Sequence, residues 1–138
     1  MRIRRPGSRR GERGQALVEF ALVLPLLLIM LFGIIDFGRA LQTYITINNA
    51  SREGARFGSI SPSGNIQQKV RTAAGDFGDD VTIVVSFPSG QDSGDSVIVD
   101  VDYEYQMITP LGAMLSTFTG GSLGTSIGLS SSSDMRLE

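Results

Sequence analysis

The stretch QALVEFALVLPLLLIMLFGII, residues 15–35, decides the fold of this chain. Glu19 is its only ionisable side chain, and Asp36 follows it directly. As a helix rising about 1.5 Å per residue, its 21 residues would reach about 30 Å, the thickness of the hydrocarbon layer of a bilayer. Its second half is apolar on all sides rather than striped, which disfavours a soluble core helix. The sequence therefore predicts a transmembrane helix over residues 15–36.

The charges on either side of this helix predict its orientation. Six arginines and a single acid precede residue 15, whereas six bases and 13 acids follow it. Because basic residues next to a span stay in the cytoplasm, we expect residues 1–14 to form a cytoplasmic leader and the acidic remainder to be exported. A basic tail can also indicate nucleic-acid binding, but this one adjoins an apolar run. We therefore expect a single-pass protein of the cytoplasmic (inner) membrane, with no nucleic-acid partner.

A cleavable secretory signal peptide is the main competing interpretation of the apolar run. Such peptides have a shorter apolar core, of about 7–15 residues, followed by a small-residue cleavage site. Here Ile35 is followed by Asp-Phe-Gly-Arg and then by a helical pattern, so cleavage there is disfavoured.

Two residues inside the predicted span need an explanation of their own. Pro25 has no backbone N–H and is expected to loosen or kink the helix about one turn upstream. Glu19 is costly if it faces lipid, so we expect it to reach the headgroups, to be protonated or to be paired.

The residues around Glu19 form a motif, Gly14-Gln15-Ala16-Leu17-Val18-Glu19-Phe20, between the basic leader and the apolar run. This motif resembles the processing site of type IV prepilins, which implies cleavage after Gly14 by a prepilin peptidase on the cytoplasmic face. Glu19 lies about one helical turn from the amine that cleavage would create at Gln15. In an apolar bundle, its carboxylate could neutralise the N-terminal ammonium of a neighbouring subunit.

A longer segment, residues 14–58, resembles the N-terminal signature of the TadE-like proteins of tight-adherence (Tad, Flp) pilus systems. One departure is Asp36, where the family commonly carries Glu. The matching features are Glu19-Phe20-Ala21, Leu24-Pro25-Leu26-Leu27-Leu28, Gly33, Asp36, Gly38-Arg39 and Ala50-Ser51-Arg52-Glu53-Gly54-Ala55-Arg56.

The resemblance implies a non-enzymatic pseudopilin, a minor pilin-like component that assembles through its N-terminal helix. The implied partners are the membrane, the prepilin peptidase and other pilin-like or pilus-assembly proteins, in a homo- or hetero-oligomer within or at the tip of a pilus. Two alternatives stay open: an uncleaved signal-anchored extracytoplasmic binding domain, and a Tad-linked enzyme or metal-binding accessory module.

The pattern after Asp36 predicts a small α+β head. Residues 37–60 keep a helical spacing, so they are interpreted as an extension of the transmembrane helix, with Gly54 and Gly58 weakening its end. The remainder, residues 61–138, is expected to form the exported domain. A loop comes first, and Asn65 then caps a short helix over residues 66–74.

Alternation of apolar and polar residues predicts two strands, at 81–87 and 97–105, paired as an antiparallel hairpin. Residues 107–118 predict either a short surface helix or a second membrane-proximal contact, too short to span. A third strand is expected in roughly residues 124–137, although Ser and Gly are poor strand formers. The predicted fold is thus a long helix followed by a short helix and an antiparallel sheet of about three strands, as in pilins.

Three charged residues, Arg52, Glu53 and Arg56, are grouped near the end of the helix extension. They form either a contact surface for another subunit or for anionic headgroups, or a solvated helix face. Cys and His are both absent, which excludes disulfides, thiolate ligands and Ser-His-Asp catalysis. We expect no catalytic residue and no cofactor. Five acids are candidate calcium ligands: Asp92, Asp95, Asp100, Asp102 and Glu104. A calcium site is disfavoured, because Asp100, Asp102 and Glu104 fit the wet face of a strand.

Overall fold

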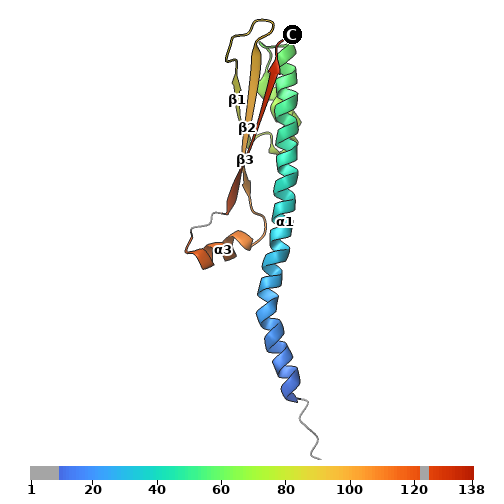
Figure 1. Ribbon diagram of the computed structural model, residues 1–138, viewed down its shortest axis with the longest axis vertical. Coiled ribbons are helices and arrows are strands. Elements are labelled where there is room, and N and C mark those ends of the chain that lie inside the picture. Colours follow the sequence, from blue (N-terminus) through green and yellow to red (C-terminus); the bar gives the residue numbers. More distant parts are fainter. Residues whose placement is uncertain (1–9, 122–124) are drawn as a thin grey trace, which may run out of the picture.

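One helix, α1 (Arg10–Ile60), extends along the whole molecule in the computed structural model, which describes residues 10–121 and 125–138 (Figure 1). The first nine residues of the predicted leader lie outside the described residues. The predicted span and its extension form one helix without a break. Pro25 lies inside it, so the missing N–H costs one backbone hydrogen bond without ending the helix.

Within the described residues, one helical segment, Gly14–Ile60, is long and apolar enough to cross a membrane, judged by length and composition. Its most apolar window has a mean hydropathy of 2.7, and none of that window is buried within the protein. This is the pattern of a membrane anchor rather than of a core helix.

The head follows α1 and is an α+β unit, as predicted. Two short helical elements come first, α2 (Ile66–Ala74) and η1 (Gly75–Phe77). The side chain of Asn65 accepts a hydrogen bond from the Gln68 amide, which confirms the predicted cap. The remaining elements are β1 (Thr82–Ser86), β2 (Ser96–Gln106), α3 (Leu111–Thr119) and β3 (Ser126–Arg136).

The three strands form an antiparallel sheet in the order β1-β2-β3. The predicted hairpin is correct, and its register pairs Val84 with Asp100. The predicted third strand is also present, paired with β2 so that Asp100 lies opposite Ser132. Figure 1 shows β2 and β3 extending lengthwise beside the second half of α1.

The core lies between α1, α2 and one face of the sheet. The odd-numbered valines of β2, Val97, Val99 and Val101, are fully buried against the helices. The alternate residues of β2 face outward, which gives the sheet one dry face and one wet face. The other buried members of the core are Ile47, Ala50, Ala55, Ile66, Val70, Ala74, Val81 and Leu137.

Gly54 and Gly58 have a role that the sequence did not indicate. Both lie inside α1 and are buried, where side chains of α2 and β2 pack against the helix. A Cβ atom on Gly54 would lie 2.3 Å from Val70 Cγ2, and one on Gly58 would lie 2.9 Å from Ile66 Cδ1. Because they have no Cβ atom, the two glycines allow side chains of α2 and β2 to pack directly against α1.

Candidate functional site

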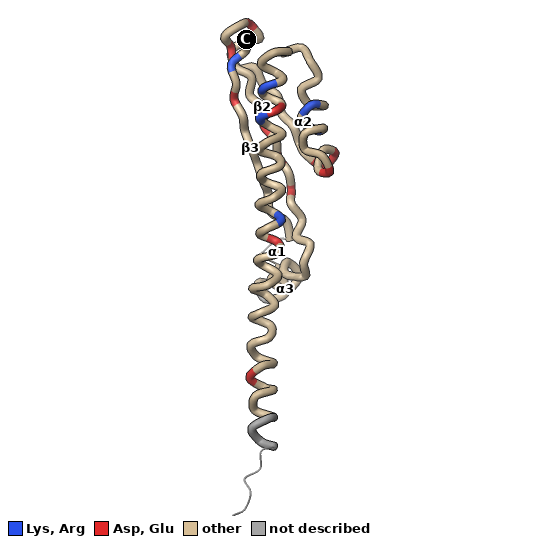
Figure 2. The backbone as a smooth tube through the Cα atoms, turned by 90° about the vertical axis from the view of Figure 1, so that its right-hand side faces the viewer, with Lys and Arg blue, Asp and Glu red and all other residues tan. Residues whose placement is uncertain are grey.

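The exposed first half of α1 is the most unusual surface of the molecule. Figure 1 shows it projecting away from the head, and Figure 2 shows it as an almost uncharged rod. Leu17, Leu22 and Leu26 are each at least 70% exposed. A contiguous apolar surface of this length in water is costly, so it requires a lipid or protein partner. We call residues 14–35 the stem.

Glu19 is the single acid of the stem and lies on its exposed surface. Its Oε1 accepts a hydrogen bond of 3.1 Å from the side-chain amide of Gln15, one turn earlier. The predicted processing pair Gly14–Gln15 lies inside α1, where a Cβ atom on Gly14 would meet nothing within 4 Å. The glycine is therefore sterically open, and its peptide is part of the helix. Phe20 and Pro25 are exposed on the same stem.

The outer end of the stem is fixed to the head by a buried carboxylate. Asp36 is only 3% exposed, although its side chain is a carboxyl group. Its Oδ1 accepts hydrogen bonds from the backbone N–H groups of Ile108 (3.0 Å) and Thr109 (3.3 Å), and its Oδ2 accepts one from the Thr109 hydroxyl. Several donors on one carboxylate compensate the cost of burying it. Asp36 thus joins α1 to the turn before α3.

Sequence reasoning placed Asp36 at the end of the span but missed this contact. The signal was available in part, because Asp36 is the only acid between Glu19 and Glu53 in a long helical stretch. Its partners lie more than 70 residues further along the chain, so the spacing of the sequence could not identify them.

An apolar groove of about 170 Å³ continues the exposed stem surface into the head. It lies between α1 and β3. Phe37 and Leu41 on α1 are 70% and 49% exposed, and Ile127 on β3 is also exposed. The apolar surface of α1 therefore extends beyond Asp36. The lining residues are Phe37, Ala40, Leu41, Tyr44, Ile127 and Leu129.

A second, more polar cavity of about 420 Å³ lies beside Arg39, Thr43 and Tyr105, next to the end of α2. The buried hydroxyl of Tyr105 has no hydrogen-bond partner among the residues that the structure describes. Burial raises the pKa of Tyr105, and the charge of Asp36 raises it further. The nearby guanidinium of Arg39 partly offsets this rise in pKa. The hydroxyl consequently stays protonated at neutral pH and is available as a donor.

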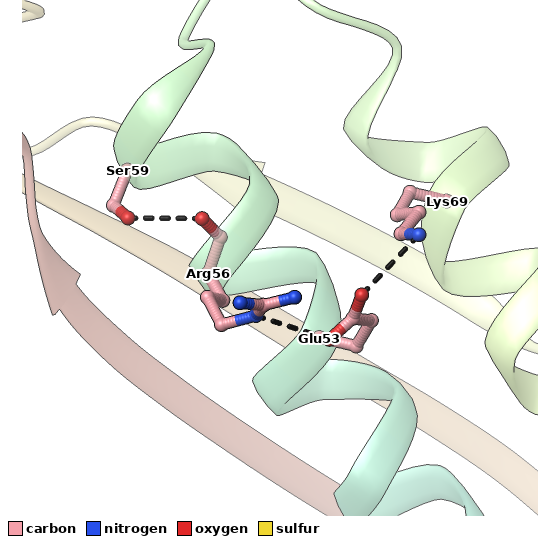
Figure 3. A network of polar contacts seen from close by, with 4 residues as sticks. All are labelled: Glu53, Arg56, Ser59 and Lys69. Atoms are coloured by element: carbon pink, nitrogen blue, oxygen red, sulfur yellow. Dashed lines mark hydrogen bonds and ion pairs between the residues drawn. The ribbon is translucent and has the colours of Figure 1, made fainter.

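The charged residues near the end of α1 form ion pairs with each other and with α2 (Figure 3). Glu53 forms ion pairs with Arg56 at 3.3 Å and with Lys69 of α2 at 3.2 Å. The hydrogen bond from Arg56, and then that from Lys69, lowers the pKa of Glu53 below its ordinary value. Arg52 and Arg56 remain exposed, so the predicted interaction face presents two positive charges outward.

The acids that suggested calcium are spread over the head. Asp100, Asp102 and Glu104 alternate along β2 on the outer face of the sheet. Asp95 instead accepts a hydrogen bond from the Asp92 amide within the turn before β2. Among the described residues, no three His, Cys, Asp or Glu side chains are grouped so that they could hold a metal ion.

Comparison with known proteins identifies the N-terminal segment. Residues 14–56 match the TadE-like protein family, over about a third of the chain. This confirms, for residues 14–56, the resemblance to TadE-like proteins drawn from the sequence. The matched segment contains the stem, Asp36 and Gly54, which is the first of the two glycines that pack against the head. It ends before the first strand of the sheet begins. No curated protein and no solved structure matches the chain.

Proposed function

We propose, from the TadE-like segment at residues 14–56, that this chain is a pseudopilin, a minor pilin-like subunit of a Tad pilus assembly system. The observation that carries the proposal is the exposed apolar stem with Glu19 as its single acid, five residues after Gly14. A membrane anchor requires neither the acid nor the glycine. A stem that is cleaved and then packed against other stems has a use for both.

In this proposal, a prepilin peptidase cuts between Gly14 and Gln15 and creates a new ammonium group at Gln15. The hydrogen bond between the side chains of Gln15 and Glu19 supports the pairing step, because it shows that the carboxylate lies within reach of the first turn. In an assembly, the carboxylate of one stem would pair with the ammonium of its neighbour and so lower the cost of burying both charges.

The membrane orientation belongs to the same proposal. The leader carries six arginines, and the rest of the chain carries 13 of the 14 acids. By the positive-inside rule, the N-terminus stays in the cytoplasm and the head lies outside the cytoplasmic membrane. The leader at 1–14, the span at 15–36, the extension at 37–60 and the head at 61–138 would then be its four functional parts.

Other pilin-like or pilus-assembly proteins are the proposed partners of the stem, in homo- or hetero-oligomers. The groove beside Leu41 supports this, because it prolongs the apolar surface of the stem along the head. The exposed Arg52 and Arg56 would add a polar contact at the far end of α1. We propose no catalytic role and no cofactor, because the stem and the groove present surfaces for packing rather than reacting groups.

Processing is tested by intact-mass analysis of the protein extracted from membranes that contain or lack an active prepilin peptidase. The expected result is loss of residues 1–14 only when the peptidase is active. A chain that retains Met1 in both membranes would contradict processing and would leave the uncleaved, signal-anchored binding domain as the better interpretation.

Pairing by Glu19 is tested separately with Glu19→Ala and with the control Asp79→Ala. Both remove an exposed acid, but only Glu19 lies in the stem. We expect the first variant to be processed yet to lose co-purification with pilin-like partners, while the control retains it. Equal co-purification by both variants would contradict the proposed pairing of Glu19 with the ammonium group of a neighbouring stem.

A further inference from the structure

The head contains a long segment without charge, which begins at the end that faces the stem. From Met107 to Ser133 the sequence has no Asp, Glu, Lys or Arg, a run of 27 residues. This run includes the turn at 107–110, α3 and most of β3. The acids of the head lie elsewhere, for example on the outer face of β2.

Two contacts fix the height of this segment along α1. The turn is bonded to Asp36 through the Ile108 and Thr109 amides. One turn lower, a Cβ atom on Gly33 would lie 3.9 Å from Leu111 Cδ2 of α3. Since about 20 residues of helix fill the hydrocarbon layer, a span that begins near Gln15 ends near these contacts. The turn and α3 therefore lie level with the outer headgroups.

The shape and surface of α3 suit that position. Figure 1 shows α3 projecting sideways from α1, not running along it. Its nine residues are too few to span a bilayer. Ile108 is 57% exposed, Ala113 is exposed, and Met114 and Leu115 are half-buried, so apolar atoms remain accessible outside the core.

The hydroxyl groups of α3 are already satisfied within the helix. Ser116 and Thr117 donate to the carbonyl oxygen of Ala113 at 2.8 and 2.9 Å, and Thr119 donates to that of Leu115 at 2.8 Å. The O–H donors of these side chains therefore need no water as a partner. Transfer of α3 from water to a headgroup region thus costs little for its polar residues.

We infer that α3 and the turn at 107–110 form a membrane-surface foot, which rests in the boundary between headgroups and acyl chains beside the stem. The occupant of this face is lipid, because the face is uncharged, internally hydrogen-bonded and continuous with the span. Asp36 holds the foot at a fixed height, so the foot sets how far the head stands above the membrane before assembly. The inference rests on the proposed span.

The chain has no tryptophan, so a single introduced tryptophan reports its own surroundings. The experiment uses the full-length protein in lipid vesicles with a spin-label quencher attached either at the headgroup or deep in the acyl chain. Ile108→Trp probes the foot, and Leu27→Trp probes the stem. Val84→Trp is the matched control, because Val84 is 50% exposed but lies on the outer face of the sheet.

The expected result is strong quenching of the Ile108→Trp variant by the headgroup label, several-fold above that of Val84→Trp. The Leu27→Trp variant should respond more to the deep label. If position 108 is quenched no more than position 84 while position 27 is quenched, the proposal of a membrane-surface foot is wrong and the proposed span stands. No quenching at position 27 overturns both. If Ile108→Trp does not fold, Ala113→Trp on α3 replaces it under the same criteria.

Discussion

At the scale of single residues, buried and paired carboxylates explain how a long exposed helix is joined to its head. Asp36 is buried with three donors, whereas Glu53 is partly exposed and paired with two cations. Asp36 contacts the turn before α3, and Glu53 contacts α2. Their effects on stability should differ, because the cost of losing a partner rises with burial.

Replacing Asp36 with Ala should weaken the attachment of the turn before α3. The substitution leaves the Ile108 and Thr109 amides without their acceptor, at a cost of about 2–3 kcal/mol in the free energy of unfolding of the head. Amide hydrogen exchange should accelerate at residues 108 and 109. Asp36→Glu keeps a carboxylate and serves as the control. Unchanged exchange in the Ala variant would show that other contacts hold the turn.

Glu53 should contribute a pH-dependent part of the stability of the head. Its pKa is lowered in the folded state, so its contribution is complete above the ordinary pKa of 4.5 and is lost as the pH falls through the lowered value. Thermal unfolding of Glu53→Gln should therefore show a smaller loss of Tm on acidification than the unmodified chain. Asp79→Asn, an exposed acid without an ion pair among the described residues, should leave that loss unchanged.

At the scale of elements, close contacts between small residues explain why α1 accepts both α2 and the sheet. Ser51 of α1 lies against β3, and its hydroxyl is 2.9 Å from those of both Ser131 and Ser133. Serine has a low strand propensity, but the serines of β3 gain a hydrogen-bond partner on α1. Gly54 likewise allows a close contact between α1 and Val70 of α2.

Gly54→Ala should destabilise the head although alanine favours helix. The new methyl group would lie 2.3 Å from Val70 Cγ2, so the core must shift at a cost of about 1–3 kcal/mol. Gly38→Ala is the matched control, because a Cβ atom there meets nothing within 4 Å. It should raise stability by about 0.5–1 kcal/mol through helix propensity. Equal shifts of Tm in the two variants would contradict the packing role.

The elements differ in how far the sequence could predict them. Hydropathy and alternation were sufficient for α1 and for the β1–β2 hairpin, because those signals are local. The third strand was predicted, but its contact with Ser51, some 80 residues away, was not. A separation of 72 and 73 residues likewise hid the contacts of Asp36 with Ile108 and Thr109. For the proposed site, Gly14 and Glu19 followed from a motif, whereas the groove required the packing of α1 on β3.

At the scale of the whole molecule, one apolar surface extends from the stem to the groove of the head. This continuity predicts that assembly contacts do not end at the membrane. Leu41→Asp should reduce oligomer formation and co-purification with pilin-like partners, because it places a charge in the groove. Leu41 is 49% exposed, so the change should cost the fold little.

Val84→Lys is the control for this prediction, since Val84 is 50% exposed on the outer face of the sheet and a lysine there would lie opposite Asp100. Crosslinking in membranes and co-purification provide the measurement. A loss of the same size in both variants would indicate a general effect of added charge, and the groove would then have no special part in assembly.

The lengthwise arrangement of the head along α1 has a mechanical consequence. β3 follows the same direction as the helix, and the chain ends beside its last turn, where the Glu138 amide donates to the Ser59 carbonyl oxygen. A pull on the head along this axis loads the bonds between β2, β3 and α1 in shear, so that many must break together rather than one after another. Tension applied to the far end of the head would therefore pass into the stem through one continuous helix, α1.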